Sequence, residues 1–172
     1  MTIEDQITDR FPQAVSWVPN IGAVNQLVVV AEGLPEIAAV LKDEFAFDML
    51  NSITGVDYLE TDPKKLAKTG FEPHVEVVYH LSSFQHPGRR LAFKIILPRW
   101  KNDIAGELPE VTSVAHLWRT ADWHERETFD LVGVRFTNHP DPRRLLMADD
   151  WVGHPLRKDY EFPLEYHDIR CR

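Results

Sequence analysis

The spacing of apolar positions predicts two short helices in the first quarter of the chain. Apolar residues recur three or four positions apart over Thr2–Phe11 and Leu34–Phe45, which places them on one helix face. Pro12 ends the first of these helices, and Pro35 suits the first turn of the second. Both segments are therefore expected to pack one apolar face against the rest of the fold.

Four apolar segments predict strands. They are Gln26–Ala31, Met49–Leu59, Val75–Leu81 and Leu91–Leu97. The turn Ser82–Arg90 joins the last two and favours a hairpin, and Gly55 marks a candidate β-bulge. Thr61–Gly70 is polar and rich in turn residues, so it is expected to be an exposed loop.

The second half of the chain is predicted to contain a helical region, a short strand and then an irregular tail. From Val111 to Val132 the pattern is helical, with a break expected at Thr120–Asp122, where Thr120 caps a second helix. A short strand is expected at Val134–Phe136. Beyond it, prolines at positions 140, 142, 155 and 163 exclude long regular elements.

This order of elements predicts an α+β fold, with a mixed, mostly antiparallel sheet, packed helices and an extended C-terminal docking segment. We expect residues 1–137 to form the globular part and residues 138–172 to form an extended partner-docking segment of the same domain. A segment so rich in Trp, Arg and His buries itself poorly, and a partner surface is the natural place for it.

Composition narrows the functional classes. The 172 residues fit one soluble domain, and the net charge of −8 argues against nucleic-acid binding. A single cysteine, Cys171, can form neither an internal disulfide nor an iron–sulfur cluster, and it favours a reducing compartment. The longest apolar run, Leu27–Ala31, is far shorter than the ~20 residues that span a bilayer. Another chain is therefore expected to provide any membrane attachment.

The densest chemistry lies around Glu125-Arg126-Glu127. Arg126 has Asp122 four residues before it and Asp130 four residues after it, which suits intrahelical ion pairs of ~0.3–0.5 kcal/mol each. A solvated, charged helix face is the plain alternative interpretation.

The apolar neighbours of this triplet point to a second role. Apolar helical lines pass through both Glu125 and Glu127, so at least one of these carboxylates should lie beside an apolar face and need a partner. Arg143 and Arg144 are the candidate partners, because guanidinium groups pair bidentately with carboxylates. The hypothesis is an acid–arginine network that fixes the C-terminal segment to the helix.

Metal and nucleotide sites have weaker support. His124, Glu127 and His139 could serve an independent metal-dependent hydrolase, but the chain has no HExxH spacing. It also lacks the glycine-rich patterns GxGxxG and GxxxxGK[ST] that bind phosphates. Trp and Arg, as in Trp151 and Arg157, are more typical of protein interfaces.

The same stretch resembles the signature of the respiratory-chain NADH dehydrogenase 30-kilodalton subunit family, which includes the C subunit of the bacterial enzyme. The matching residues are Glu125-Arg126-Glu127, Asp130, Leu131-Val132, His139, Arg143 and Leu145-Leu146. The segment Asp150–Tyr160 is similar to the tail that follows the signature in this family.

The resemblance implies a scaffold subunit in the peripheral arm of a proton-translocating NADH:quinone oxidoreductase. It implies no flavin, cluster or metal in this chain, with NADH, FMN, iron–sulfur clusters and quinone on other subunits. It also implies docking on the large quinone-site subunit and beside other peripheral-arm subunits, at the cytoplasmic face of the inner (plasma) membrane. Related plastoquinone-reducing and membrane-bound hydrogenase complexes remain alternatives.

The resemblance carries no catalytic residue, and the expected site is an interface or an internal network. Its candidate residues are Glu125, Arg126, Glu127, Asp130, His139, Arg143, Arg144, Trp151, His154, Arg157, Lys158 and Asp159.

Overall fold

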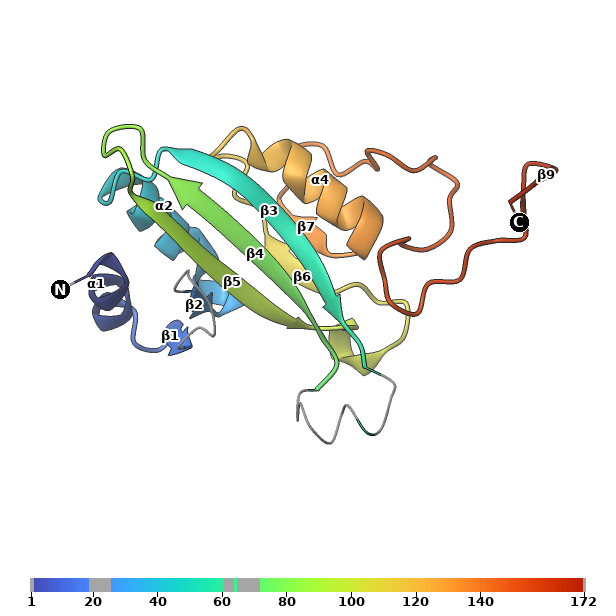
Figure 1. Ribbon diagram of the computed structural model, residues 1–172, viewed down its shortest axis with the longest axis horizontal. Coiled ribbons are helices and arrows are strands. Elements are labelled where there is room, and N and C mark those ends of the chain that lie inside the picture. The colour runs from blue at the N-terminus through green and yellow to red at the C-terminus, as the bar shows by residue number, and fades with distance from the viewer. Residues whose placement is uncertain (1, 19–25, 61–63, 65–71, 172) are drawn as a thin grey trace.

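The computed structural model describes residues 2–18, 26–60, 64 and 72–171. A five-stranded sheet in the order β1-β2-β5-β4-β3 organises the chain (Figure 1). Its strands are β1 (Val15–Val18), β2 (Gln26–Val29), β3 (Met49–Tyr58), β4 (His74–Ser82) and β5 (Arg90–Pro98). Only the β2–β5 pair is parallel in this sheet, so the mixed, mostly antiparallel arrangement is confirmed.

Three helices of the described residues accompany the sheet. They are α1 (Ile3–Arg10), α2 (Leu34–Asp43) and α4 (Ala121–Val132), with short 3-10 turns η1 (Ala31–Gly33) and η2 (Lys101–Asp103). Thr2 starts α1 with a capping box that includes Asp5. Pro35 lies in the first turn of α2, as expected. Apolar residues of these helices join the sheet in one hydrophobic cluster.

The central hairpin β4–β5 shows why one face of the sheet is the core. Val75, Val77 and Tyr79 alternate along β4 and are fully buried. Glu76 and Val78 lie between them and are also nearly buried, at 6% and 9%, whereas His80 and, on β5, Ile96 are exposed. Alternate strand residues point to opposite faces, so the fully buried set marks the core face and the exposed His80 and Ile96 mark the opposite face.

Two of the predicted local features concern β3 and the residues that follow it. The expected bulge at Gly55 is wrong, because the register shift lies between Leu50 and Ser52. Gly55 instead allows close packing of α4, since a Cβ there would lie 2.8 Å from Thr128 Cγ2. The expected loop Thr61–Gly70 lies outside the described residues except for position 64.

The predicted helix over Val111–Val132 is correct only in its second half. Its first residues belong to β6 (Glu110–Thr112), which pairs in parallel with β7 (Arg135–Thr137). Thr120 precedes α4, but its hydroxyl donates to the carbonyl of Leu50 at 3.1 Å instead of capping the helix. The apolar residues Val111, Val114 and Trp118 of this segment are buried, but they lie in a strand and in turns instead of a helix.

The C-terminal segment has two parts. Residues 138–160 run back along α4 with little regular structure, and the following residues project away from the sheet (Figure 1). The projecting part ends in a small hairpin of β8 (Glu165–Tyr166) and β9 (Ile169–Arg170). Strand β1 was not predicted from the sequence.

Candidate functional site

Asp130 is the centre of the contacts between α4 and the C-terminal segment. Its side chain is fully buried, and Oδ2 accepts hydrogen bonds from the backbone N–H groups of Leu145, Leu146 and Met147 at 2.6–3.0 Å. Oδ1 accepts from Arg144 Nη1 at 2.7 Å. Burial raises the pKa of Asp130, but these hydrogen bonds outweigh burial and hold it below its ordinary value. The ionised carboxylate therefore holds residues 144–147 of the segment against α4.

Arg144 extends this cluster to the next turn of the segment. Its Nη2 donates to the carbonyl groups of Trp151 at 3.0 Å and Gly153 at 3.1 Å. The neighbouring His154 uses Nδ1 to donate to the backbone carbonyl of Asp130 at 2.9 Å. Burial lowers the pKa of His154, so its neutral form is favoured.

Arg157 binds the carbonyl groups at the C-terminal end of α4. Its guanidinium donates to the carbonyl groups of Val132 at 2.5 Å, Gly133 at 3.1 Å and Arg99 at 3.0 Å. It also lies 4.5 Å from the centre of the Trp100 ring. The last carbonyl groups of a helix have no partner within the helix and carry partial negative charge, so a cation there stabilises the helix end.

Asp57 and Arg99 form a second buried pair that sequence reasoning missed. Arg99 contacts Asp57 bidentately at 2.7 and 2.8 Å and also contacts Asp159 at 2.8 Å. The N–H of Lys158 donates to Asp57 at 2.8 Å, whereas the Lys158 side chain is exposed. A charged residue inside the apolar segment Met49–Leu59 was the only sequence signal for this pair.

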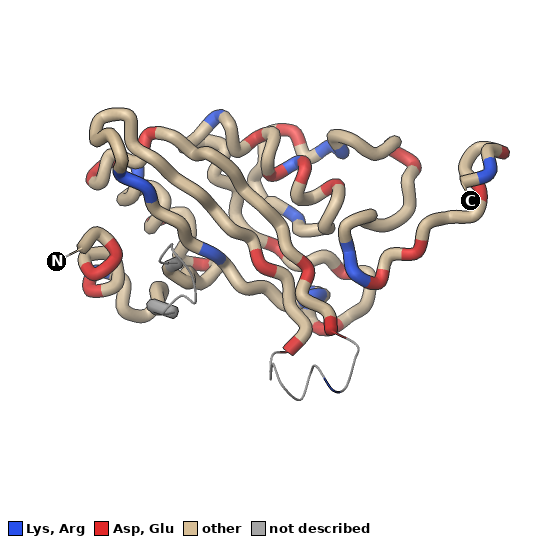
Figure 2. The backbone as a smooth tube through the Cα atoms, in the orientation of Figure 1, with Lys and Arg blue, Asp and Glu red and all other residues tan. Residues whose placement is uncertain are grey.

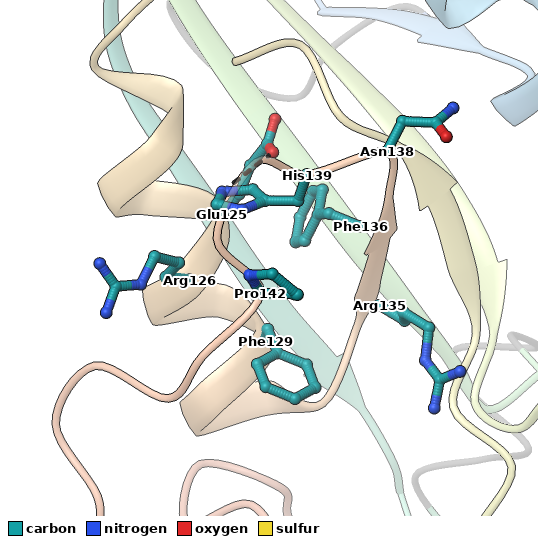
Figure 3. A pocket seen from close by; sticks show the side chains of 8 residues that line it. All are labelled: Glu125, Arg126, Phe129, Arg135, Phe136, Asn138, His139 and Pro142. Atoms are coloured by element: carbon teal, nitrogen blue, oxygen red, sulfur yellow. Dashed lines mark ion pairs between the residues drawn. The ribbon is translucent and has the colours of Figure 1, made fainter.

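Glu125 is buried without an arginine partner. Oε1 accepts from the N–H of Val114 at 2.8 Å, while Oε2 has no hydrogen-bond partner among the described residues. Burial raises its pKa to about 7. His139 Nε2 lies 3.7 Å from Oε2, as the dashed line in Figure 3 marks. His139 Nδ1 accepts from the N–H of Asp141, so the neutral ring carries its proton on Nε2.

The predicted acid–arginine network is present with different pairs. Arg126 donates to the carbonyl groups of Arg143 and Arg144 rather than forming the predicted pairs with Asp122 and Asp130. Arg143 pairs with its neighbour Asp141 and is largely exposed. Glu127 is also exposed and faces His124 at 4.0 Å, so the α4 carboxylate that pairs with an arginine of the segment is Asp130 and not one of the two glutamates.

The candidate residues therefore divide into two groups. Most tie the segment to the body of the domain, and Figure 2 shows acidic positions along α4 with basic positions of the segment beside them. These residues are Arg126, Asp130, His139, Arg144, His154, Arg157 and Asp159. Glu125 hydrogen-bonds to Val114 and approaches the segment only at His139, 3.7 Å away. The side chains of Glu127, Arg143 and Lys158 face solvent, and Trp151 packs on Tyr166 with a ring distance of 4.9 Å.

Two further observations concern metals and membranes. In the described part of the chain, no three His, Cys, Asp or Glu side chains come together as metal ligands would. None of the helices described here has both the length and the apolar character needed to cross a bilayer. The hydrolase alternative gains no support, since both ring nitrogens of His139 already have protein partners.

Comparison with known proteins gives relatives over nearly the whole chain. The chain is 36% identical to the C subunit of the NADH-quinone oxidoreductase of Citrifermentans bemidjiense, covering 95% of this chain and 89% of that protein. It is 38% identical to the protein of the same name from Herpetosiphon aurantiacus, covering 98% and 86%.

Solved structures give the same answer. The trypsin-resistant fragment (1–134) of Nqo5 matches with a TM-score of 0.62 and 27% identity, covering 82% of this chain and 99% of that fragment. A chain of the membrane-bound sulfane sulfur reductase, an archaeal respiratory membrane complex, matches with a TM-score of 0.68 and 25% identity, covering 92% and 84%. The family model for the respiratory-chain NADH dehydrogenase 30 Kd subunit matches residues 27–166. The chain belongs to this family of oxidoreductase subunits.

Proposed function

We propose that this chain is a scaffold subunit in the peripheral arm of a proton-translocating NADH:quinone oxidoreductase. It docks on the large quinone-site subunit through its C-terminal segment and holds no redox centre of its own. Electron transfer from NADH through FMN and iron–sulfur clusters to quinone takes place on other subunits. Partner chains keep it at the cytoplasmic face of the membrane.

The distribution of exposed apolar side chains carries this proposal. Six of the twelve large apolar side chains that are exposed in the described residues lie between positions 146 and 169. They are Leu146, Val152, Leu156, Phe162, Leu164 and Ile169. Concentrated apolar exposure is typical of a protein interface. Because residues 161–171 project from the body (Figure 1), this arm can reach a neighbouring subunit.

The test is co-purification of the tagged full chain from native membranes, washed at moderate and then high salt. We expect the full chain to retain the large quinone-site subunit together with NADH:quinone activity. A chain ending at Tyr160 should melt at the same temperature but recover at least about tenfold less of that subunit, because it lacks the projecting apolar contacts. Undiminished recovery with the shortened chain would contradict docking through the arm.

A point substitution gives a matched control for the truncation. Leu164→Asp places a charge in the arm, and Ile104→Asp does the same at a comparably exposed position outside it. We expect only the first substitution to reduce recovery of the partner.

The alternative is the equivalent subunit of a related membrane complex. The similarity to a chain of the sulfane sulfur reductase supports this alternative. The proteins recovered in the same experiment distinguish the two, because NADH-oxidising subunits accompany only the NADH:quinone oxidoreductase. A chain recovered alone with stoichiometric metal would instead favour the independent hydrolase.

A further inference from the structure

A cleft of about 360 Å³ lies between α4, β7 and the first turn of the C-terminal segment (Figure 3). Its apolar walls are Phe129, Phe136 and Pro142. This volume is near the lower end of the roughly 300–1,000 Å³ found for ligand pockets. The cleft therefore suits one or two side chains better than a large cofactor.

Charge around the cleft is positive although the whole chain carries −8. On one side, Glu110 is shared by Lys101 at 2.7 Å and Arg135 at 3.8 Å. Lys101 is the closer partner, and Arg135 keeps 60% of its side chain exposed. This wall therefore offers a cation whose charge is only partly compensated.

On the opposite side of the cleft, one carboxylate is again shared by two cations. Asp141 is shared by Arg143 at 2.7 Å and Arg126 at 3.7 Å. In Figure 3, Arg126 and Arg135 lie on opposite sides of the cleft. Burial raises the pKa of Glu125, which lines the floor, to about 7, so its negative charge is reduced near neutral pH. These pairs leave the rim suited to an acidic occupant.

Strand β7 forms one wall of the cleft and is joined to β6 on its other side. The N–H of Arg135 donates to Pro109, and the carbonyl of Thr137 accepts from Ser113, so both residues direct their polar groups toward β6 and its flanks. In a strand, the residue between them directs its N–H and C=O to the opposite edge. The polar backbone groups of Phe136 therefore point away from β6, and with only 5% of the residue exposed, its ring is what it contributes to the cleft wall.

We propose that this cleft binds an extended segment of a partner subunit that carries an apolar side chain next to a carboxylate. The apolar side chain enters between Phe129, Phe136 and Pro142, and the carboxylate contacts Arg135. The inference rests on the proposed scaffold function and adds a second docking point, separate from the projecting arm.

A zero-length crosslink tests the acidic contact directly in the assembled complex. Arg135→Lys keeps the charge and adds an amine that carbodiimide joins only to a touching carboxylate. We expect mass spectrometry to find position 135 linked to an Asp or Glu of another subunit, adjacent to a large apolar residue. Arg90→Lys is the matched control, since Arg90 is also an exposed first residue of a strand but lies outside the cleft.

A charge exchange then tests whether the contact contributes to binding. Arg135→Glu should reduce recovery of the linked subunit at least about tenfold, and an Asp or Glu→Arg change at the linked residue should restore it. Arg90→Glu should have no effect. A link from position 135 only to this chain or to a second copy would overturn the proposal, as would undiminished recovery with Arg135→Glu. Failure of the wild-type chain to co-purify would instead contradict the scaffold function itself.

Discussion

Arg157 is a buried cation whose hydrogen bonds all go to backbone carbonyl groups. Only 6% of the residue is exposed, and burial lowers its pKa. Its three carbonyl partners belong to the end of α4 and to the residue after β5. The side chain therefore joins two elements to the C-terminal segment, and its removal leaves those carbonyl groups without a charged partner.

Arg157→Ala is expected to lower the free energy of unfolding by roughly 3 kcal/mol, because hydrogen bonds to charged groups are lost and their buried acceptors remain. Urea denaturation measures this. Lys158→Ala, at the exposed neighbouring position, should change it by less than about 0.5 kcal/mol. A small loss for Arg157→Ala would mean that water replaces the guanidinium easily.

Glu125 gives the second prediction at this scale. Its pKa is raised to about 7 in the folded chain from an ordinary value of 4.5. Between these values the folded state binds more protons than the unfolded state, so this group lowers stability as pH rises. Glu125→Gln removes the titration and keeps an acceptor for the N–H of Val114.

The stability of Glu125→Gln relative to wild type should therefore rise by about 2–3 kcal/mol between about pH 5 and pH 8. Chemical denaturation across this range measures the difference. Glu127→Gln, on the exposed face, serves as the control and should show no such trend. A flat difference for Glu125→Gln would show that the carboxylate is hydrated in solution.

At the scale of elements, α4 holds the segment that follows it. Asp130 collects three N–H groups from residues 145–147 and the Arg144 guanidinium. A buried carboxylate with this many donors replaces the regular structure that prolines exclude from this part of the chain.

Asp130→Asn should lower the free energy of unfolding by roughly 3 kcal/mol, since it breaks a buried ion pair and turns one acceptor into a donor. Trypsin should then cleave after Arg144 faster than in wild type, in a limited-proteolysis time course. Asp141→Asn is the control, because Asp141 makes its closest ion pair with the exposed Arg143. Equal cleavage rates for both variants would argue against a special role for Asp130.

Elements were predicted correctly where nearby residues determine them, and wrongly where contacts with distant residues do. The helices Ile3–Arg10 and Leu34–Asp43 and the hairpin β4–β5 followed from periodicity and turn residues. The helix predicted over residues 111–120 was wrong, because apolar residues spaced as in a helix can also be buried by a short strand and turns. Pairing with β7 and the contact from Glu125 to Val114 select the second arrangement.

At the scale of the whole molecule, the chain on both sides of residue 137 contributes to the folded body. We expected residues 138–172 to be a docking segment. Its first part, up to position 160, is hydrogen-bonded to α4 through Arg144, His154 and Arg157. The exposed apolar residues beyond it suit a partner.

A chain ending at Thr137 should therefore be less stable than wild type by at least about 3 kcal/mol, because α4 loses its C-terminal cation and its buried ion pair. A chain ending at Tyr160 should keep nearly the full stability. Thermal and urea unfolding of both truncations measure the contrast. Equal stabilities would show that the whole segment is dispensable for folding.

The sequence by itself determined the family, the α+β class and most elements, because these depend on local periodicity, on turn residues and on a closely spaced charged motif. The tertiary structure decided which carboxylates are buried and which arginine each one meets. Asp57 and Lys158 are 101 positions apart, and Asp130 meets residues 14–17 positions further along. Such pairings depend on chain reversal and on burial, which no local pattern encodes.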